Sequence, residues 1–140
     1  MRRRVLPLLA LAVAAGCSSA PPKPADISIS GTLSVHGGQS WNNIEGEECS
    51  MFEAGYSDIR QGAQVVVTDA TGKTLALGTL GAGKRHLPEG AAPVARRCAF
   101  PFTVQAPGGQ DFYGIEVSHR GRLQYTAEQV REPLELTLGD

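Results

Sequence analysis

Hydrophobic and polar residues alternate with a period of two in the part of the chain that follows residue 26. From Ile27 to Val35, apolar residues and Gly31 occupy every second position, and serine or threonine occupies each position between them. This alternation is typical of a β-strand with one buried face and one face in water. The sequence therefore predicts a strand over 27–35, which His36 and the glycines after it end.

Later runs of apolar and β-branched residues predict further strands. Ala63–Thr68 and Lys73–Leu80 are joined through Asp69–Gly72, whose aspartate and glycine favour a tight hairpin. The remaining predicted strands are Cys98–Val104, Phe112–Ser118, Leu123–Tyr125 and Leu134–Leu138. Pro101 has no backbone donor, which favours an edge or a bulge for its strand. The side chains expected to face the core from the first two of these strands are Cys98, Phe100, Phe102, Val104, Tyr113, Ile115 and Val117.

One turn of helix is predicted before the last strand. Thr126 and Gln129 have the spacing of a capping box, so we expect a helical turn that reaches Arg131 and stops at Pro133. About seven short strands separated by turn signals predict an all-β fold, an antiparallel β-sandwich of the immunoglobulin-like or prealbumin-like type. An aromatic content of 6%, with 17 glycines and 9 prolines, also suits a loop-rich β domain. We expect this domain to span residues 27–140.

Residues 1–16 follow the pattern of a secretory signal peptide. Three arginines, Arg2 to Arg4, precede the apolar stretch Val5–Ala15, which is too short to span a bilayer permanently. The arginines also fit a loose twin-arginine pattern, so the Sec and twin-arginine export routes both stay open. Either route ends outside the cytoplasmic membrane.

The four residues Ala14-Ala15-Gly16-Cys17 resemble the lipobox of bacterial lipoproteins, with alanine in place of the usual leucine three positions before the cysteine. This resemblance implies that Cys17 receives a diacylglycerol and becomes the first residue of the mature chain. We therefore expect attachment to the cell membrane, on its extracytoplasmic face, through acyl chains on Cys17. The alternative is an ordinary signal peptide followed by an unrelated cysteine.

Residues 17–26 are expected to form the lipid anchor and a proline-rich linker. Pro21, Pro22 and Pro24 favour an extended polyproline II segment of roughly 20–25 Å. Cleavage before Cys17 removes three of the 13 basic residues and none of the 14 acidic ones, which leaves a formal charge of −4. Anionic headgroups do not attract such a domain, so the lipid has to anchor it, and we expect no nucleic-acid partner.

Cys49 and Cys98 remain once Cys17 is assigned to lipid. An even pair of cysteines outside the cytoplasm predicts one disulfide, which closes a loop of about 50 residues. Two separate buried thiols are the alternative.

Three strings resemble small prealbumin-like sandwich modules, such as carboxypeptidase regulatory-like domains and the collagen-adhesin B-type repeats of surface proteins. They are GAQVVVTDATGKTLA (62–76), CAFPFTV (98–104) and YGIEV (113–117). The chain also resembles small lipoproteins of high-GC Gram-positive bacteria and their phages. The first strand has no lysine and the last has no asparagine, so the isopeptide bond of adhesin repeats does not carry over.

Candidate catalytic and binding groups are scattered. His36, His86 and His119 lack the spacing of metal ligands, and the common hydrolase and nucleotide-binding motifs do not occur. We therefore expect no catalytic residue, metal or cofactor. A histidine that met a serine or a carboxylate in a pocket would instead indicate an enzyme acting on an envelope substrate.

Three groups of residues are candidates for binding. They are the acidic residues Glu45, Glu47, Glu48, Glu53 and Asp58, the basic residues Lys84, Arg85, Arg96 and Arg97, and the aromatic residues Trp41 and Tyr56. The acidic group could hold Ca²⁺, although a solvated loop is the simpler interpretation. The basic group could contact an anionic polymer or the acidic loop. The aromatic pair could recognise a glycan or a peptide, or serve only in packing.

The leading hypothesis is a lipid-anchored, non-enzymatic module that binds or scaffolds an envelope protein or glycan. The enzyme described above is one alternative, and a surface-exclusion or structural lipoprotein is another.

Overall fold

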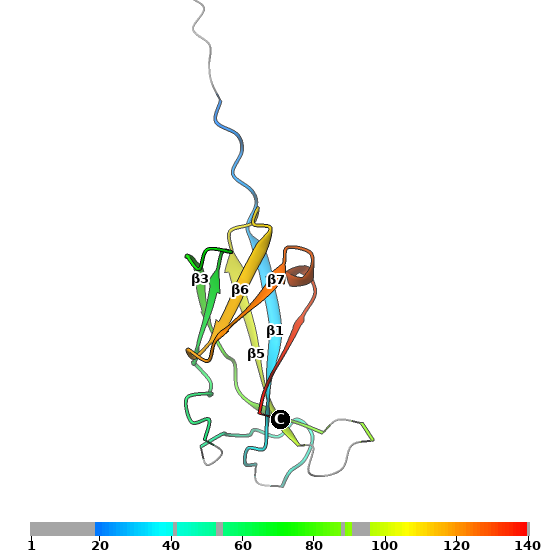
Figure 1. Ribbon diagram of the computed structural model, residues 1–140. Coiled ribbons are helices and arrows are strands. Elements are labelled where there is room, and N and C mark those ends of the chain that lie inside the picture. The colour runs from blue at the N-terminus through cyan, green and yellow to red at the C-terminus, as the bar shows by residue number, and fades with distance from the viewer. Residues whose placement is uncertain (1–18, 41, 53–54, 88, 91–95, 140) are drawn as a thin grey trace, which may run out of the picture.

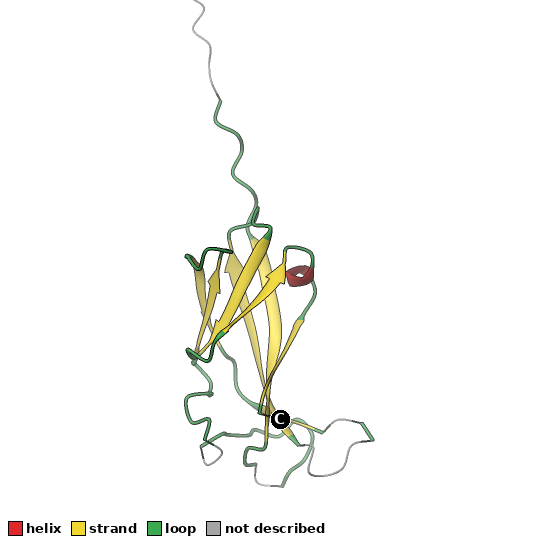
Figure 2. Ribbon diagram, in the orientation of Figure 1, coloured by secondary structure: helices red, strands yellow, loops and turns green. Residues whose placement is uncertain are grey.

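The computed structural model describes residues 19–40, 42–52, 55–87, 89–90 and 96–139. Within these residues the strands form two four-stranded sheets that pack as a sandwich (Figures 1 and 2). The predicted all-β sandwich is thus confirmed. No helix in the described part of the chain is both long enough and apolar enough to cross a membrane.

The first sheet is built around the pairing of its two longest strands. Its order is β4 (Lys84–His86), β5 (Arg97–Ala106), β1 (Ile27–His36) and β8 (Leu134–Leu138). β1 and β5 pair antiparallel along their whole length, so that Ile27 lies opposite Ala106 and His36 opposite Arg97. β8 is the exception to the antiparallel pattern, because it pairs with β1 in the parallel direction.

The second sheet is antiparallel throughout. Its order is β3 (Thr74–Thr79), β2 (Gln64–Thr68), β6 (Phe112–Val117) and β7 (Arg122–Thr126). The predicted hairpin joins β2 to β3. In its turn the Asp69 Oδ1 accepts hydrogen bonds from the N–H groups of Thr71 at 2.8 Å and Lys73 at 3.0 Å, and Gly72 has a φ of 91°.

The core lies between the sheets and follows the alternation in the sequence. The side chains predicted to face it from β5 and β6 are all buried, and so are Ile29, Leu33 and Val35 of β1. Gly31 continues this inward face because β8 passes too close for a side chain. A Cβ on Gly31 would lie 2.5 Å from the Leu134 carbonyl oxygen and 2.7 Å from the Phe102 ring.

Pro101 does not mark an edge strand, which corrects the expectation from the sequence. β5 lies between β4 and β1, but β4 reaches only as far as the pair Lys84–Ala99. At Pro101 the neighbour is the connection before β4, where the Gly81 N–H donates to the Pro101 carbonyl at 2.7 Å. The N and O of a strand residue point to the same side, so the missing donor of Pro101 faces this short connection and not β1.

The predicted helical turn is a 3₁₀ helix, η2 (Gln129–Arg131). Two reciprocal bonds precede it, as the capping-box spacing predicts: the Thr126 N–H donates to Gln129 Oε1 at 2.8 Å, and the Gln129 N–H donates to Thr126 Oγ1 at 3.2 Å. This turn carries the chain from β7 of the second sheet to β8 of the first (Figure 2).

Candidate functional site

Two connections meet at the end of the sandwich opposite the N-terminal segment (Figure 1). They are the described residues of the segment 37–63, between β1 and β2, and those of the segment 80–96, between β3 and β5, which includes β4. We call them the distal loops. They come together because β1 ends where its antiparallel partner β5 begins.

The described part of the N-terminal segment, residues 19–26, lies at the other end of the sandwich (Figure 1). A Cβ on Gly108 would lie 2.2 Å from the Ala25 carbonyl oxygen, and one on Gly109 would lie 2.6 Å from the Pro24 ring. These close approaches hold residues 24–25 against the loop between β5 and β6, so the segment before them points away from the distal loops (Figure 1). The predicted lipid-attachment residue, Cys17, lies outside the described residues.

Cys49 and Cys98 form the predicted disulfide, with a Cα–Cα distance of 5.9 Å. Cys98 on β5 is fully buried, whereas Cys49 in the first distal loop is partly exposed. The bond therefore fastens the first distal loop to a central strand of the sandwich.

Backbone pairing fastens the same loop a second time. Residues 45–49 run along β4 like an additional strand: the Cys49 N–H donates to the Gly83 carbonyl at 3.0 Å, and the Arg85 N–H donates to the Glu47 carbonyl at 2.7 Å. A Cβ on Gly83 would lie 2.8 Å from the Cys49 carbonyl oxygen, so this approach needs a glycine. The two distal loops consequently form one connected layer.

Arg85 is buried beneath this layer, with a relative exposure of 2%. Its guanidinium donates to the carbonyl oxygens of Gly37 at 2.9 Å and Gly38 at 2.8 Å, and to Ser40 Oγ at 3.2 Å. A longer bond of 3.5 Å reaches the Arg97 carbonyl. Arg85 therefore organises the start of the first distal loop.

The acidic residues of the first distal loop have separate partners. Glu45 accepts from the Leu87 N–H at 2.5 Å and pairs with His86 at 3.3 Å; these two contacts lower the pKa of its carboxyl. Glu47 accepts from the Asn42 N–H, and Glu48 pairs with Lys84 at 3.4 Å. Lys84 and His86 thus contact the acidic loop, one of the two roles considered for the basic group. Glu53 lies outside the described residues, and in the described part no group of His, Cys, Asp and Glu is placed to hold a metal ion.

The three histidines occupy separate positions. His36 and His86 lie on either side of Arg97, across β1, β5 and β4, and Arg97 Nε is buried with no hydrogen-bond partner among the described residues. His119 pairs with Glu116 at the turn between β6 and β7, 3.3 Å away.

A small pocket of about 160 Å³ lies beside the disulfide. Its buried apolar lining includes Met51, Ile59 and Phe100, and Phe52 at its border is 70% exposed. Pockets for organic ligands usually measure about 300–1,000 Å³. This pocket therefore suits a single side chain or a sugar substituent better than a cofactor.

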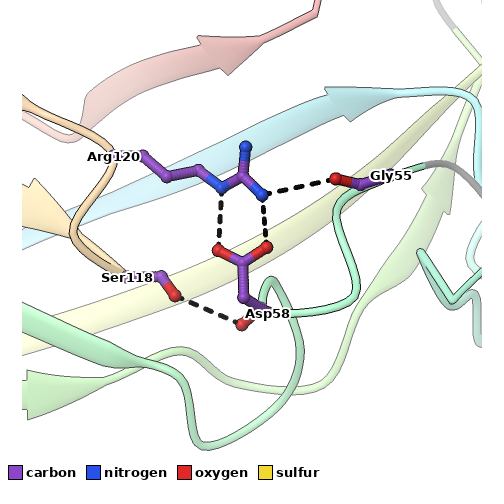
Figure 3. A network of polar contacts seen from close by, with 4 residues as sticks. All are labelled: Gly55, Asp58, Ser118 and Arg120. Carbon is purple, nitrogen blue, oxygen red and sulfur yellow. Dashed lines mark hydrogen bonds and ion pairs between the residues drawn. The ribbon is translucent and has the colours of Figure 1, made fainter.

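A polar network closes the first distal loop against the turn between β6 and β7 (Figure 3). Arg120 forms a bidentate ion pair with Asp58, with Nε to Oδ2 at 2.7 Å, and its Nη2 also donates to the Gly55 carbonyl at 3.4 Å. The guanidinium lies over the Tyr56 ring, 4.7 Å from its centroid. Tyr56 thus has a packing role, and its predicted neighbour Trp41 lies outside the described residues.

Sequence reasoning missed two of these features. Arg85 was grouped with the surface cations, because nothing in the segment Lys84-Arg85-His86 marks its middle residue as buried. The partner of Asp58 was not found either, because Arg120 is distant in sequence and no periodicity connects the two residues.

Neither a protein-family model, nor a curated protein, nor a solved structure matches this chain.

Acidification should weaken the network around Asp58. The bidentate bond from Arg120 holds the pKa of Asp58 far below its usual range. Such a carboxyl stabilises the fold above its unfolded-state pKa of about 3.9, and this contribution declines as the pH falls toward the folded-state pKa. Asp58→Asn should thus lower the free energy of unfolding by up to about 1 kcal/mol at pH 7, since the pair is partly exposed. The deficit should shrink below about pH 4.

Urea unfolding of both proteins from pH 7 to pH 2.5 measures this difference. Glu128→Gln, an exposed change that also removes one negative charge, is the control and should show no such pH dependence. A deficit for Asp58→Asn that stays constant across the series would contradict the assignment.

Loss of the disulfide should loosen the distal loops first. The bond joins residues 49 apart in sequence, so replacing both cysteines with alanine should cost at most about 4 kcal/mol in the chain-entropy account. Hydrogen exchange should accelerate at the N–H groups of Gly46 and Arg85, which connect the two distal loops. The Val66 N–H lies within the second sheet, so it should still exchange only when the whole domain unfolds. Equal acceleration at all three sites would show that the bond stabilises only the whole domain.

Proposed function

We propose that this protein is a lipid-anchored envelope protein on the extracytoplasmic face of the cell membrane, whose distal loops bind or scaffold an envelope protein or a glycan without catalysing a reaction. The observation that carries this proposal is the placement of the N-terminal segment and the distal loops at opposite ends of the sandwich (Figure 1). A tether at one end and a loop surface at the other is the arrangement that such a module needs.

The anchor rests on the lipobox-like residues 14–17 and on the segment that follows them. Residues 19–26 have neither helix nor strand, and their prolines favour extended conformations. Acyl chains on Cys17 would therefore hold the domain beside the membrane without contact between the sandwich and the lipid.

The binding surface is proposed on the distal loops for two reasons. They expose large apolar side chains, and several contacts restrain their conformation. Ile44, Phe52 and Leu87 are large hydrophobic side chains that remain exposed there. Three restraints hold the loops beneath them: the disulfide, the pairing of residues 45–49 with β4, and Arg85. A surface that is ordered before binding loses less conformational entropy on association.

The anchor is tested by the intact mass of the membrane-extracted protein, with and without reduction. We expect a chain that begins at Cys17, carries two or three acyl chains and gains two mass units on reduction. The Cys17→Ala variant should lose the lipid mass and leave the membrane fraction. A wild-type chain that is soluble and unacylated would overturn the lipoprotein proposal.

The binding surface is tested by site-specific photo-crosslinking in intact cells. A photoreactive phenylalanine analogue at position 52 should give adducts, because Phe52 lies on the distal loops. Phe112 is the matched control, since it is an exposed phenylalanine at the start of β6, near the N-terminal segment. Protease and muramidase digestion then separate protein adducts from glycan adducts. Adducts from position 112 alone, or from neither position, would contradict the proposed surface.

A further inference from the structure

Two guanidinium groups line one open pocket in the distal loops. The pocket has a volume of about 510 Å³ and is lined by Gly37, Gly38, Gln39, Ser40, Asn43, Arg85 and Arg96. It is separate from the small apolar pocket beside the disulfide. Its lining combines two positive charges with hydroxyl, amide and backbone groups.

Neither guanidinium has a carboxylate within ion-pair distance in the described part of the chain. The ion pairs there connect other residues, and neither Arg85 nor Arg96 takes part in one. Glu45, Glu47 and Glu48, the nearest acidic residues in sequence, accept bonds from other groups. Burial lowers the pKa of Arg85 and the positive charge of Arg96 lowers it further, whereas the negative charge of Glu47 raises it; the net shift is downward. The charge of Glu47 thus compensates the two neighbouring cations only in part, and an anion bound between their guanidinium groups would compensate them further.

The geometry leaves donors for such an anion. A guanidinium has five N–H groups, and Arg85 uses four of them on three carbonyl oxygens and Ser40 Oγ. Arg96 is exposed at the rim. With the amide of Asn43 oriented to satisfy its neighbours, its oxygen accepts from Arg96 Nε at 2.8 Å. A neutral amide thus occupies the place where an acidic partner would bind more strongly.

We propose that the pocket between Arg85 and Arg96 is an oxyanion-binding site, which takes a carboxylate or phosphate group carried by the envelope partner. Arg96 supplies the accessible charge and exchanges Asn43 for the oxyanion. Arg85 supplies a charge whose position is fixed by its hydrogen bonds to the carbonyls of Gly37 and Gly38. Ser40 lies at the same wall, where its side chain links Arg85 to the Glu47 carboxylate.

This inference rests on the proposed function only for the identity of the partner that carries the oxyanion. The site itself is tested on the full-length chain with Cys17→Ala, which carries no acyl chain. A negative result in the mass experiment would therefore contradict the lipid anchor and not the oxyanion site. A negative result in the titration below would contradict the oxyanion site and not the anchor.

Inorganic phosphate and acetate are the probes, titrated in separate experiments and followed by amide NMR shifts at constant ionic strength against chloride. We expect saturable shifts of the amides from Gly37 to Asn43 for at least one probe. Arg96→Gln should weaken this binding about tenfold, the loss expected for one charge-assisted hydrogen bond. Arg131→Gln is the matched control, since it removes the same charge from exposed η2 at the opposite end, and should weaken binding less than twofold.

Saturation by phosphate alone would identify phosphate as the ligand group, and saturation by acetate alone would identify carboxylate. Shifts that grow linearly for both probes, or that persist unchanged in Arg96→Gln, would overturn the site. Asn43→Asp puts a carboxylate in place of the amide that faces Arg96 and should weaken binding at least tenfold; it decides the question if Arg96→Gln fails to fold.

Discussion

The antiparallel ladder between β1 and β5 determines what lies at each end of this protein. Each strand has ten residues and pairs with the other along its whole length. The segment before β1 must therefore leave at one end, and the loops after β1 and before β5 must meet at the other. The disulfide joins these loops at the same end, because Cys98 is the second residue of β5. The separation of tether and loops is thus a consequence of one backbone pairing.

Arg85 shows how a buried charge can organise a loop layer without an ion pair. Its guanidinium is satisfied by carbonyl dipoles and one hydroxyl. Such partners fix the conformation of residues 37–40, but they compensate a full positive charge only in part. An aspartate in place of Ser40 would put a carboxylate beside the Arg85 guanidinium and cancel one of the two positive charges of the pocket. With serine at this position, the guanidinium groups of Arg85 and Arg96 line the pocket with no carboxylate within ion-pair distance among the described residues.

The sequence predicted the parts of the fold that depend on local patterns. The alternation in Ile27–Val35, the turn at Asp69–Gly72 and the Thr126–Gln129 pair each have a short-range physical cause, and each is present. Setting Cys17 aside for lipid left one pair of cysteines, and that pair forms the disulfide. The parallel pairing of β8 and the inward position of Arg85 could not be predicted, because both depend on which segments meet in space. The edge position predicted for Pro101 was wrong for a related reason. Its strand is central, but the neighbour on the side of its missing N–H is the short connection before β4 and not a regular strand.

The dimensions of the protein indicate which charged surfaces the distal pocket can meet. Ten strand residues extend about 33 Å at roughly 3.3 Å each, and the proline-rich segment adds roughly 20–25 Å. With acyl chains on Cys17, as proposed, the distal loops can stand about 50 Å from the bilayer, several times the Debye length of about 8 Å in physiological salt. Anionic headgroups are screened at that distance, so the guanidinium groups of Arg85 and Arg96 act on what lies beyond the membrane. If the chain begins at Cys17, as proposed, its net negative charge would disfavour non-specific adsorption of anionic polymers over the rest of the surface, and an anionic partner would bind preferentially at the positive pocket.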